Sequence, residues 1–146
     1  MPKIRLEIVT ADRLIYSEDV DSFIAPGISG ELGILPEHAN LVTILDTGVL
    51  TIVKDGEEDY MAIAGGYMEV QPTHAVILAD AAERDSDIDL DRAEAARARA
   101  EEAAKNTTNI DSQLAAEAAL KRSLVRIKVA KRRTNRTRKP PTQSAG

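Results

Sequence analysis

Several residue types are missing or scarce in this chain of 146 residues. It contains no cysteine, which excludes disulfide bonds, thiolate metal ligands and thiol nucleophiles. Aromatic residues make up 3% of the chain, so no row of side chains that could stack on nucleic-acid bases is visible. The two histidines, His38 and His74, lie far apart in the sequence without a ligand cluster, and we predict neither a metal site nor a catalytic constellation.

Glycine and proline are absent from Thr73 to Lys139, although seven of the eight glycines lie at or before Gly66. These two residue types mark turns, because glycine permits positive φ and proline fixes φ and lacks a donor. The chain therefore divides into a turn-rich part and a part with helical spacing. The change in composition near Asp85 predicts a domain of roughly 85 residues and an appendage of roughly 50.

Acidic residues are absent after position 120. Residues 1–120 contain nine Lys and Arg and all 24 Asp and Glu, whereas residues 121–146 contain ten Lys and Arg and no acid. The net charges of −15 and +10 predict that the basic end binds an acidic partner, which can be the chain's own acidic half.

The first part has the pattern of short strands. Residues 4–8 (Ile-Arg-Leu-Glu-Ile) alternate between apolar and charged side chains, and seven further apolar runs follow. Asp55-Gly56 is a strong hairpin signal, and Gly65-Gly66 indicates a bulge or a close backbone approach. Many short strands with frequent turns favour a β-sandwich or barrel over residues 1–85.

Three glycines, Gly27, Gly30 and Gly33, recur every third residue, but no Lys-Ser/Thr pair and no helical pattern follow them. A phosphate-binding loop is therefore not predicted, and a surface loop is. Residues 29–36 place Leu and Ile between these glycines. Apolar residues on a loop predict a contact surface.

The second part predicts two helices. The first runs from about Asp89 to Ala104, with an aspartate as its N-cap, and the second starts at Asp111 or Ser112. We expect a helical hairpin over residues 86–133 and a basic, disordered tail over residues 134–146. The apolar face of the first helix is almost entirely alanine, so we expect docking worth only a few kcal/mol, at ~0.8 kcal/mol per buried methyl. Such an arm can have two positions that a ligand selects.

The alternating aspartates at positions 85, 87, 89 and 91 are similar to a calcium loop. Leu90 stands where the sharp-turn glycine is required, and Ala96 where the bidentate glutamate is required. A calcium site is therefore rejected.

Four stretches taken together resemble the epsilon subunit of F-type ATP synthases. They are residues 30–38 (Gly-Glu-Leu-Gly-Ile-Leu-Pro-Glu-His), 64–70 (Ala-Gly-Gly-Tyr-Met-Glu-Val), 82–93 and 119–122. The likeness extends in the right order from residue 3 to about residue 130. It implies an α+β fold, with an N-terminal antiparallel β-sandwich followed by a C-terminal α-helical hairpin.

The resemblance also implies a non-catalytic rotor subunit that couples proton flow to ATP synthesis. The sandwich would bind the gamma subunit and rest on the ring of c subunits. The hairpin would lie folded on the sandwich, or extend along gamma into the alpha/beta catalytic head and suppress ATP hydrolysis. The residues implied in these contacts are Glu31, Leu32, Gly33, Ile34 and His38 for the c-ring, and Lys121, Arg122, Arg126 and Lys128 for the acidic beta subunits.

Residues 88–93 match the I/L-D-x-x-R-A motif of members of this family that respond to ATP. The resemblance implies ATP as a regulatory ligand that holds the folded form, and no required cofactor. The implied ATP contacts are Glu83, Ile88, Asp89, Arg92, Ala93, Arg99, Arg122 and Arg126. Arginine suits phosphate because its planar fork donates two parallel hydrogen bonds. Alternatively, an acid followed three residues later by arginine only supports a helix start.

Two other classes compete with this interpretation. A nucleic-acid-binding module would use the basic end, but the scarcity of aromatics and the −15 remainder disfavour it, and we expect no nucleic-acid partner. A small hydrolase would use paired acids such as Asp85/Asp87 or Glu57/Glu58, which are more typical of solvated turns.

The cellular location follows from the same resemblance. Residues 1–3 lead directly into the first predicted strand, and no run of about 18 apolar residues occurs. We therefore expect a peripheral protein on the cytoplasmic face of the plasma membrane rather than the thylakoid. The role of the basic residues 131–139 stays open between acidic beta-subunit surfaces and anionic lipid headgroups.

Overall fold

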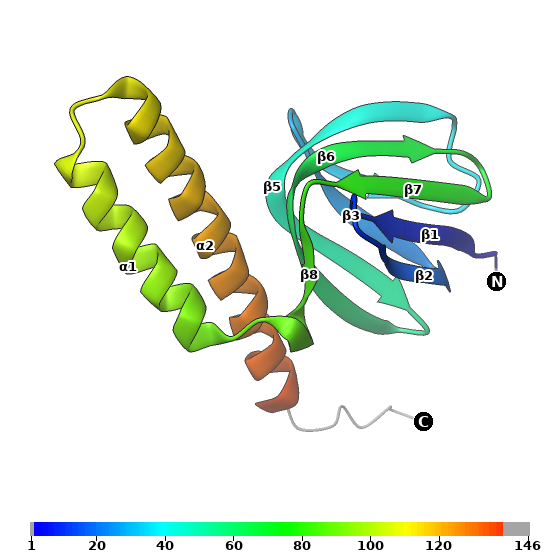
Figure 1. Cartoon of the computed structure of the whole chain (residues 1–146). Helices are drawn as coiled ribbons and strands as arrows, with labels where there is room; N and C mark the ends of the chain where they lie inside the picture. Colours follow the sequence, from blue (N-terminus) through cyan, green and yellow to red (C-terminus); the bar gives the residue numbers. More distant parts are fainter. Residues whose placement is uncertain (1, 139–146) are drawn as a thin grey trace.

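The computed structural model describes the backbone of residues 2–138 and the side chains of residues 2–132. Strands come first and helices follow, which confirms the predicted α+β order (Figure 1). The strands are β1 (Ile4–Val9), β2 (Leu14–Val20), β3 (Ser22–Gly27), β4 (Gly30–Ile34), β5 (Leu41–Lys54), β6 (Glu57–Val70), β7 (His74–Ala79) and β8 (Ala82–Arg84). A 3₁₀ turn, η1 (Asp85–Asp87), leads to the helices α1 (Leu90–Asn106) and α2 (Ile110–Arg138).

The strands follow the order β2-β1-β7-β6-β5-β3-β4, with β8 paired to β6. The pairs are antiparallel except β1 with β7, which run parallel, so the predicted all-antiparallel pairing has one exception. The two longest strands, β5 and β6, curve so that the sheet folds over into two layers (Figure 1). Apolar residues from both layers, such as Leu6, Phe23 and Met68, are fully buried between them.

Two glycine signals predicted from the sequence are confirmed. Asp55 and Gly56 form the tight turn between β5 and β6 with φ of 52° and 80°, as a type I′ hairpin requires. Gly66 has φ of 131°, and a Cβ there would lie 2.1 Å from the carbonyl oxygen of Leu78. At this close approach β6 changes its partner from β7 to β8.

The prediction of a surface loop over residues 29–36 is wrong for most of that segment. Gly30–Ile34 is strand β4, paired with β3. Leu32 packs against the core and Ile34 is only 1% exposed, because the two residues share the inward face of the strand. Only Gly30 among its glycines has positive φ, so the glycine spacing was mistaken for a series of turns.

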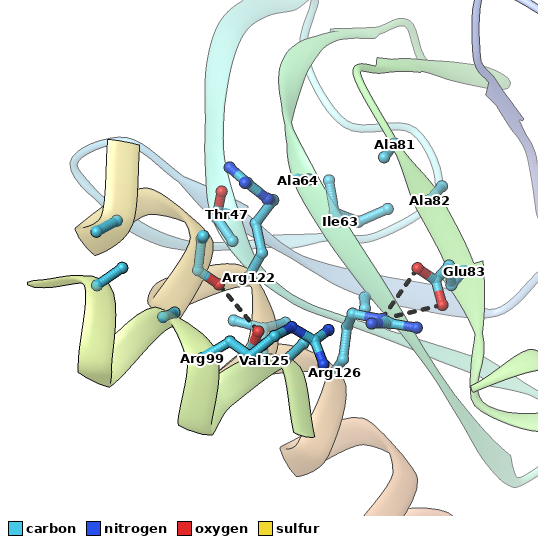
Figure 2. Close-up of a pocket in the computed structure, with 17 residues that line it drawn as sticks. Thr47, Ile63, Ala64, Ala81, Ala82, Glu83, Arg99, Arg122, Val125 and Arg126 are labelled. Carbon is cyan, nitrogen blue, oxygen red and sulfur yellow. Dashed lines mark hydrogen bonds and ion pairs between the residues drawn. The ribbon is translucent and has the colours of Figure 1, made fainter. Parts of the chain in front are cut away.

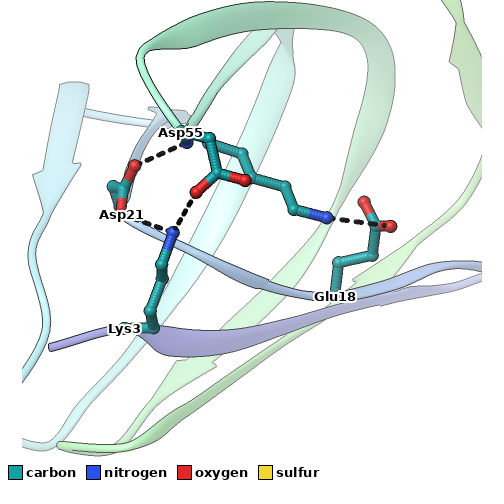
Figure 3. A network of polar contacts seen from close by, with 5 residues as sticks. Lys3, Glu18, Asp21 and Asp55 are labelled. Carbon is teal, nitrogen blue, oxygen red and sulfur yellow. Dashed lines mark hydrogen bonds and ion pairs between the residues drawn. The ribbon is translucent and has the colours of Figure 1, made fainter. Parts of the chain in front are cut away.

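Charged pairs hold the corner where β1, β2 and the β5–β6 turn meet (Figure 3). Lys3 Nζ lies 2.9 Å from Asp21 and 2.7 Å from Asp55, and Lys54 lies 3.1 Å from Glu18. The hydrogen bond from Lys3 holds the pKa of Asp21 below its usual value, and that from Lys54 does the same for Glu18. The first strand is thereby tied to two turns that are distant in sequence.

Side-chain caps define both helix starts. Asp89 Oδ1 accepts a hydrogen bond from the backbone N–H of Arg92 at 3.2 Å, as predicted for an N-cap. Asn109 Oδ1 accepts from the N–H groups of Asp111 at 2.8 Å and Ser112 at 3.4 Å. The predicted helical hairpin is therefore confirmed. No helix within residues 2–138 is long and apolar enough to cross a membrane.

Helix α2 ends at Arg138, five residues past the predicted end of the hairpin at residue 133. The prediction of a disordered tail from residue 134 is therefore wrong for residues 134–138. The helix can continue because no glycine or proline occurs before Pro140. The remainder of the predicted tail, residues 139–146, lies outside the described residues.

The hairpin docks on the sandwich through a second apolar cluster. Ile88, Ala93, Ile127, Val129 and Ala130 are buried there against Ala62 of β6. Helix α1 packs on α2, and α2 supplies the contacts with β5 and β6. The expectation that alanines of the first helix carry the docking therefore needs correction. Branched side chains contribute most, since each fully buried Ile or Val is worth about 1.5–3 kcal/mol.

Candidate functional site

A cavity of about 530 Å³ lies where the hairpin meets the sandwich (Figure 2). Its walls come from β5, β6 and β8 on one side and from both helices on the other. Most of the lining is alanine, namely Ala62, Ala64, Ala81 and Ala82 of the sandwich and Ala96, Ala100, Ala103, Ala116 and Ala119 of the hairpin. These small side chains leave space between the two walls.

Three arginines and one glutamate give the cavity a positive charge. Arg126 extends toward Glu83, with Nε 3.1 Å from Oε1 and 3.2 Å from Oε2 (Figure 2). Arg99 of α1 and Arg122 of α2 also line the cavity, and neither forms an ion pair with a carboxylate of residues 2–132. Both guanidinium groups are exposed to solvent, and they are therefore free to donate to an anionic ligand that offers several oxygen acceptors.

The structure brings four of the eight predicted ATP residues together in this cavity, namely Glu83, Arg99, Arg122 and Arg126. The four residues of the sequence motif do not line it. Ile88 and Ala93 are buried in the second apolar cluster. Asp89 caps α1 and the Arg92 side chain is exposed, so the motif here forms a helix start. Their contact with a nucleotide stays a prediction.

Sequence reasoning missed the alanine wall of the sandwich. Alanine recurs at positions 62 and 64 of β6, at position 82 of β8 and at position 81 just before β8. That pattern was the available signal for a cavity. Only the pairing of β6 with β8 brings these alanines together on one wall.

The residues predicted to contact the c-ring do not form one exposed apolar loop. Glu31 and Gly33 lie on the outward side of β4, while Leu32 and Ile34 point inward. His38 follows the C-terminal end of β4, and its Nδ1 lies 2.7 Å from the carbonyl oxygen of Ala39. The structure does not test the contact itself, which stays a prediction.

An exposed apolar row crosses the outer face of the sheet instead. Strand register places Ile44 beside Tyr67, Tyr67 beside Leu78, and Leu78 beside Val9. Ile28 and Leu14 extend the row at its two ends, through a backbone bond to Ile44 and pairing with Val9 respectively. Apart from the partly buried Val9, these side chains are 49–62% exposed. Contiguous exposed apolar residues typically mark a protein interface.

The basic residues predicted to contact beta subunits face the chain's own sandwich in part. Lys121 Nζ lies 2.8 Å from Asp46 Oδ2, and Arg126 pairs with Glu83. The hydrogen bond from Lys121 holds the pKa of Asp46 below its usual value. Lys128 is exposed beside Arg132, whose guanidinium stacks 5.1 Å from the ring centroid of Tyr60. The prediction that the basic end binds the acidic half is confirmed for two ion pairs, Lys121 with Asp46 and Arg126 with Glu83.

Within residues 2–132, no three His, Cys, Asp or Glu side chains are grouped so that they could hold a metal ion.

The fold and the hairpin-covered cavity define a two-part protein whose two parts match two family models. Residues 3–85 match the beta-sandwich domain of the ATP synthase delta/epsilon chain, and residues 86–131 match its long alpha-helix domain. The chain therefore belongs to the ATP synthase delta/epsilon chain family. Membership makes it a non-catalytic subunit and not itself an enzyme, as predicted.

The similar curated proteins are named ATP synthase epsilon chain. One from Herpetosiphon aurantiacus is 50% identical over 133 residues, covering 91% of this chain and 98% of that protein. One from Dehalococcoides mccartyi is 48% identical over 136 residues, covering 91% and 96%. These matches identify the epsilon chains as the branch of the family that this chain resembles.

Two solved assemblies contain chains with the same fold. A chain of the Euglena gracilis mitochondrial ATP synthase (OSCP/F1/c-ring) has a TM-score of 0.77 at 23% identity, covering 89% of this chain and 82% of that chain. A chain of the Tetrahymena thermophila mitochondrial central stalk/c-ring has a TM-score of 0.58 at 14% identity, covering 88% and 96%. At these identities the likeness shows the fold alone.

Proposed function

We propose that this chain is a central-stalk subunit of an F-type ATP synthase whose hairpin restrains ATP hydrolysis unless ATP holds it folded. The observation that carries the proposal is the arginine-lined cavity shared by the sandwich and both helices. ATP acts there as a regulatory ligand, and the chain requires no cofactor.

The position of the cavity couples ligand binding to the position of the hairpin. Its walls include β6 and β8 together with Arg99 of α1 and Arg122 of α2, so the complete site exists only when the hairpin is folded. A ligand that binds one of two states shifts the equilibrium toward that state by its differential affinity. An anion in the cavity therefore favours the folded hairpin.

The chemistry of the lining fits a nucleoside triphosphate. The exposed Arg99 and Arg122 offer forked donors to phosphate oxygens, and the alanine wall can receive an uncharged ring. A volume of about 530 Å³ lies within the range of small-molecule sites.

Calorimetry with ATP on the full chain tests the proposal. Arg122→Ala is expected to weaken binding by about 10- to 100-fold, because a hydrogen bond to a charged group is worth roughly 1.5–3 kcal/mol. Arg97→Ala is the matched control, since Arg97 lies on α1 outside the cavity and pairs with Glu101 at 2.9 Å. No binding heat in the wild type, or equal affinity in Arg122→Ala, would contradict the nucleotide site.

The apolar row supports docking of the gamma subunit on the outer face of the sandwich. Replacing Tyr67 by Asp places a charge in the middle of that row and is expected to abolish co-purification with gamma. Ile24→Asp serves as the control, because Ile24 is also exposed but lies on β3. Retention of gamma by the Tyr67 variant would remove the row from this role.

The other partners follow from the same proposal. Residues Glu31–His38 meet the c-ring, and the extended hairpin reaches the alpha/beta head through its basic face. The subunit is then peripheral to the membrane, on the cytoplasmic face of the plasma membrane, and takes part in ATP synthesis coupled to proton transport. Cross-linking of a Cys at position 31 or 38 to the c subunit in the assembled enzyme tests this orientation.

A further inference from the structure

Three side-chain contacts join α2 to the sandwich at successive positions along the helix. They are Lys121 with Asp46, Arg126 with Glu83, and Arg132 with the ring of Tyr60. Lys121 and Arg132 are eleven residues apart, which corresponds to about 17 Å of helix. Of the three contacts, Lys121–Asp46 lies nearest the tip of the hairpin, and neither of its residues lines the arginine-lined cavity.

The apolar anchor of the hairpin is confined to the other half of α2. Ile127, Val129 and Ala130 are buried against the sandwich, all of them C-terminal to Lys121. The cavity separates Ala116 and Ala119 from the strands. The half of α2 near the tip therefore has no comparable apolar support in the described part of the chain.

The backbone of β5 prepares Asp46 for this contact. Asp46 lies on β5 between Leu45, which stands opposite Gly66 of β6, and Thr47, which stands opposite Ala64 in the same register. Asp46 Oδ1 accepts from the N–H of Thr47 at 2.7 Å, which leaves Oδ2 for Lys121 at 2.8 Å. The carboxylate is thus oriented before the helix docks.

We propose that Asp46 and Lys121 form a clasp that holds the tip-proximal half of the hairpin against the sandwich without nucleotide. Asp46 is a positioning residue in this device, because it acts on the hairpin through Lys121. The clasp must open before Lys121 can meet a carboxylate of another subunit. That last consequence rests on the proposed extension of the hairpin, whereas the clasp itself does not.

Segment-resolved amide exchange of the nucleotide-free full chain tests the clasp. In Asp46→Asn, exchange in α1 and in residues 110–120 is expected to rise about two- to fivefold, the range for a half-exposed ion pair. Exchange in β1 and β7 should not change. Lys121→Gln should reproduce the result from the other partner. Glu18→Gln is the matched control, because it removes the Lys54–Glu18 pair of similar exposure inside the sandwich.

A charge exchange separates the ion pair from general damage. Lys121→Asp alone should loosen the hairpin further, and adding Asp46→Lys should restore slow exchange. The difference between wild type and Asp46→Asn should shrink near 1 M salt, where the Debye length is about 3 Å. Unchanged exchange in Asp46→Asn, or no rescue by the double exchange, overturns the clasp. Absence of ATP binding would instead refute the nucleotide site and leave this measurement valid.

Discussion

Replacing Ile127 by alanine should loosen the hairpin without unfolding the sandwich. Ile127 is 8% exposed and belongs to the cluster formed with Ile88, Val129 and Ala62. Its side chain therefore contributes to docking, whereas the larger cluster between the two layers of the sandwich does not include it. Truncating a buried isoleucine to alanine costs about 2–5 kcal/mol, depending on how far the site collapses.

The magnitude converts directly into a population of undocked hairpin. A loss of about 2–3 kcal/mol corresponds to about a 30- to 150-fold increase, because 1.4 kcal/mol is a factor of ten. Amide exchange in α1 and α2 should accelerate by that factor while exchange in β1 and β7 stays as in the wild type. Leu124→Ala is the control on the same helix, since Leu124 is 48% exposed, and it should change exchange less than about fivefold.

Two outcomes would refute the reasoning. Equal acceleration in the strands and in the helices would show that docking and sandwich folding form one cooperative unit. No acceleration anywhere would show that the second apolar cluster does not hold the hairpin. In either case the hairpin would not be a separately movable arm.

Further predictions concern acid stability, a backbone contact and a helix cap. The pKa of Asp21 is lower in the folded protein than its unfolded-state value of about 3.9, so the ionised carboxylate stabilises the fold above that pH. This stabilisation is lost as the pH falls through the folded-state pKa. Because Lys3 is the main cause of the shift, Lys3→Gln should reduce the loss of urea resistance between pH 6 and pH 3. Gly66→Ala should lower stability by at least about 1–3 kcal/mol in urea unfolding, because its positive φ is strained for alanine and its Cβ would meet Leu78. Asn109→Ala should cost roughly 1 kcal/mol of helix stability and speed exchange at the start of α2. An unaltered acid response, an undiminished midpoint or unchanged exchange, respectively, would contradict these three expectations.

Local signals in the chain were sufficient to predict many of its elements. The Asp55-Gly56 turn, the Asp89 cap and the break before Asp111 depend on a few adjacent residues whose conformational preferences are strong. The resemblance carried by residues 30–38 and 64–70 led to the correct family. Strand β4 was not predicted because glycines occur in strands as well as in turns. Its extended conformation depends on pairing with β3, which the local sequence does not show.

The sequence by itself determined that a β domain precedes a helical hairpin, because alternation, helical spacing and turn residues are properties of short segments. Only the tertiary structure decided where function can lie. Glu83 of β8 meets arginines from two helices in one cavity, and Asp46 meets Lys121 across 75 positions. The apolar row likewise depends on β1 lying parallel to β7. Such meetings depend on strand register and helix docking, which no short segment encodes.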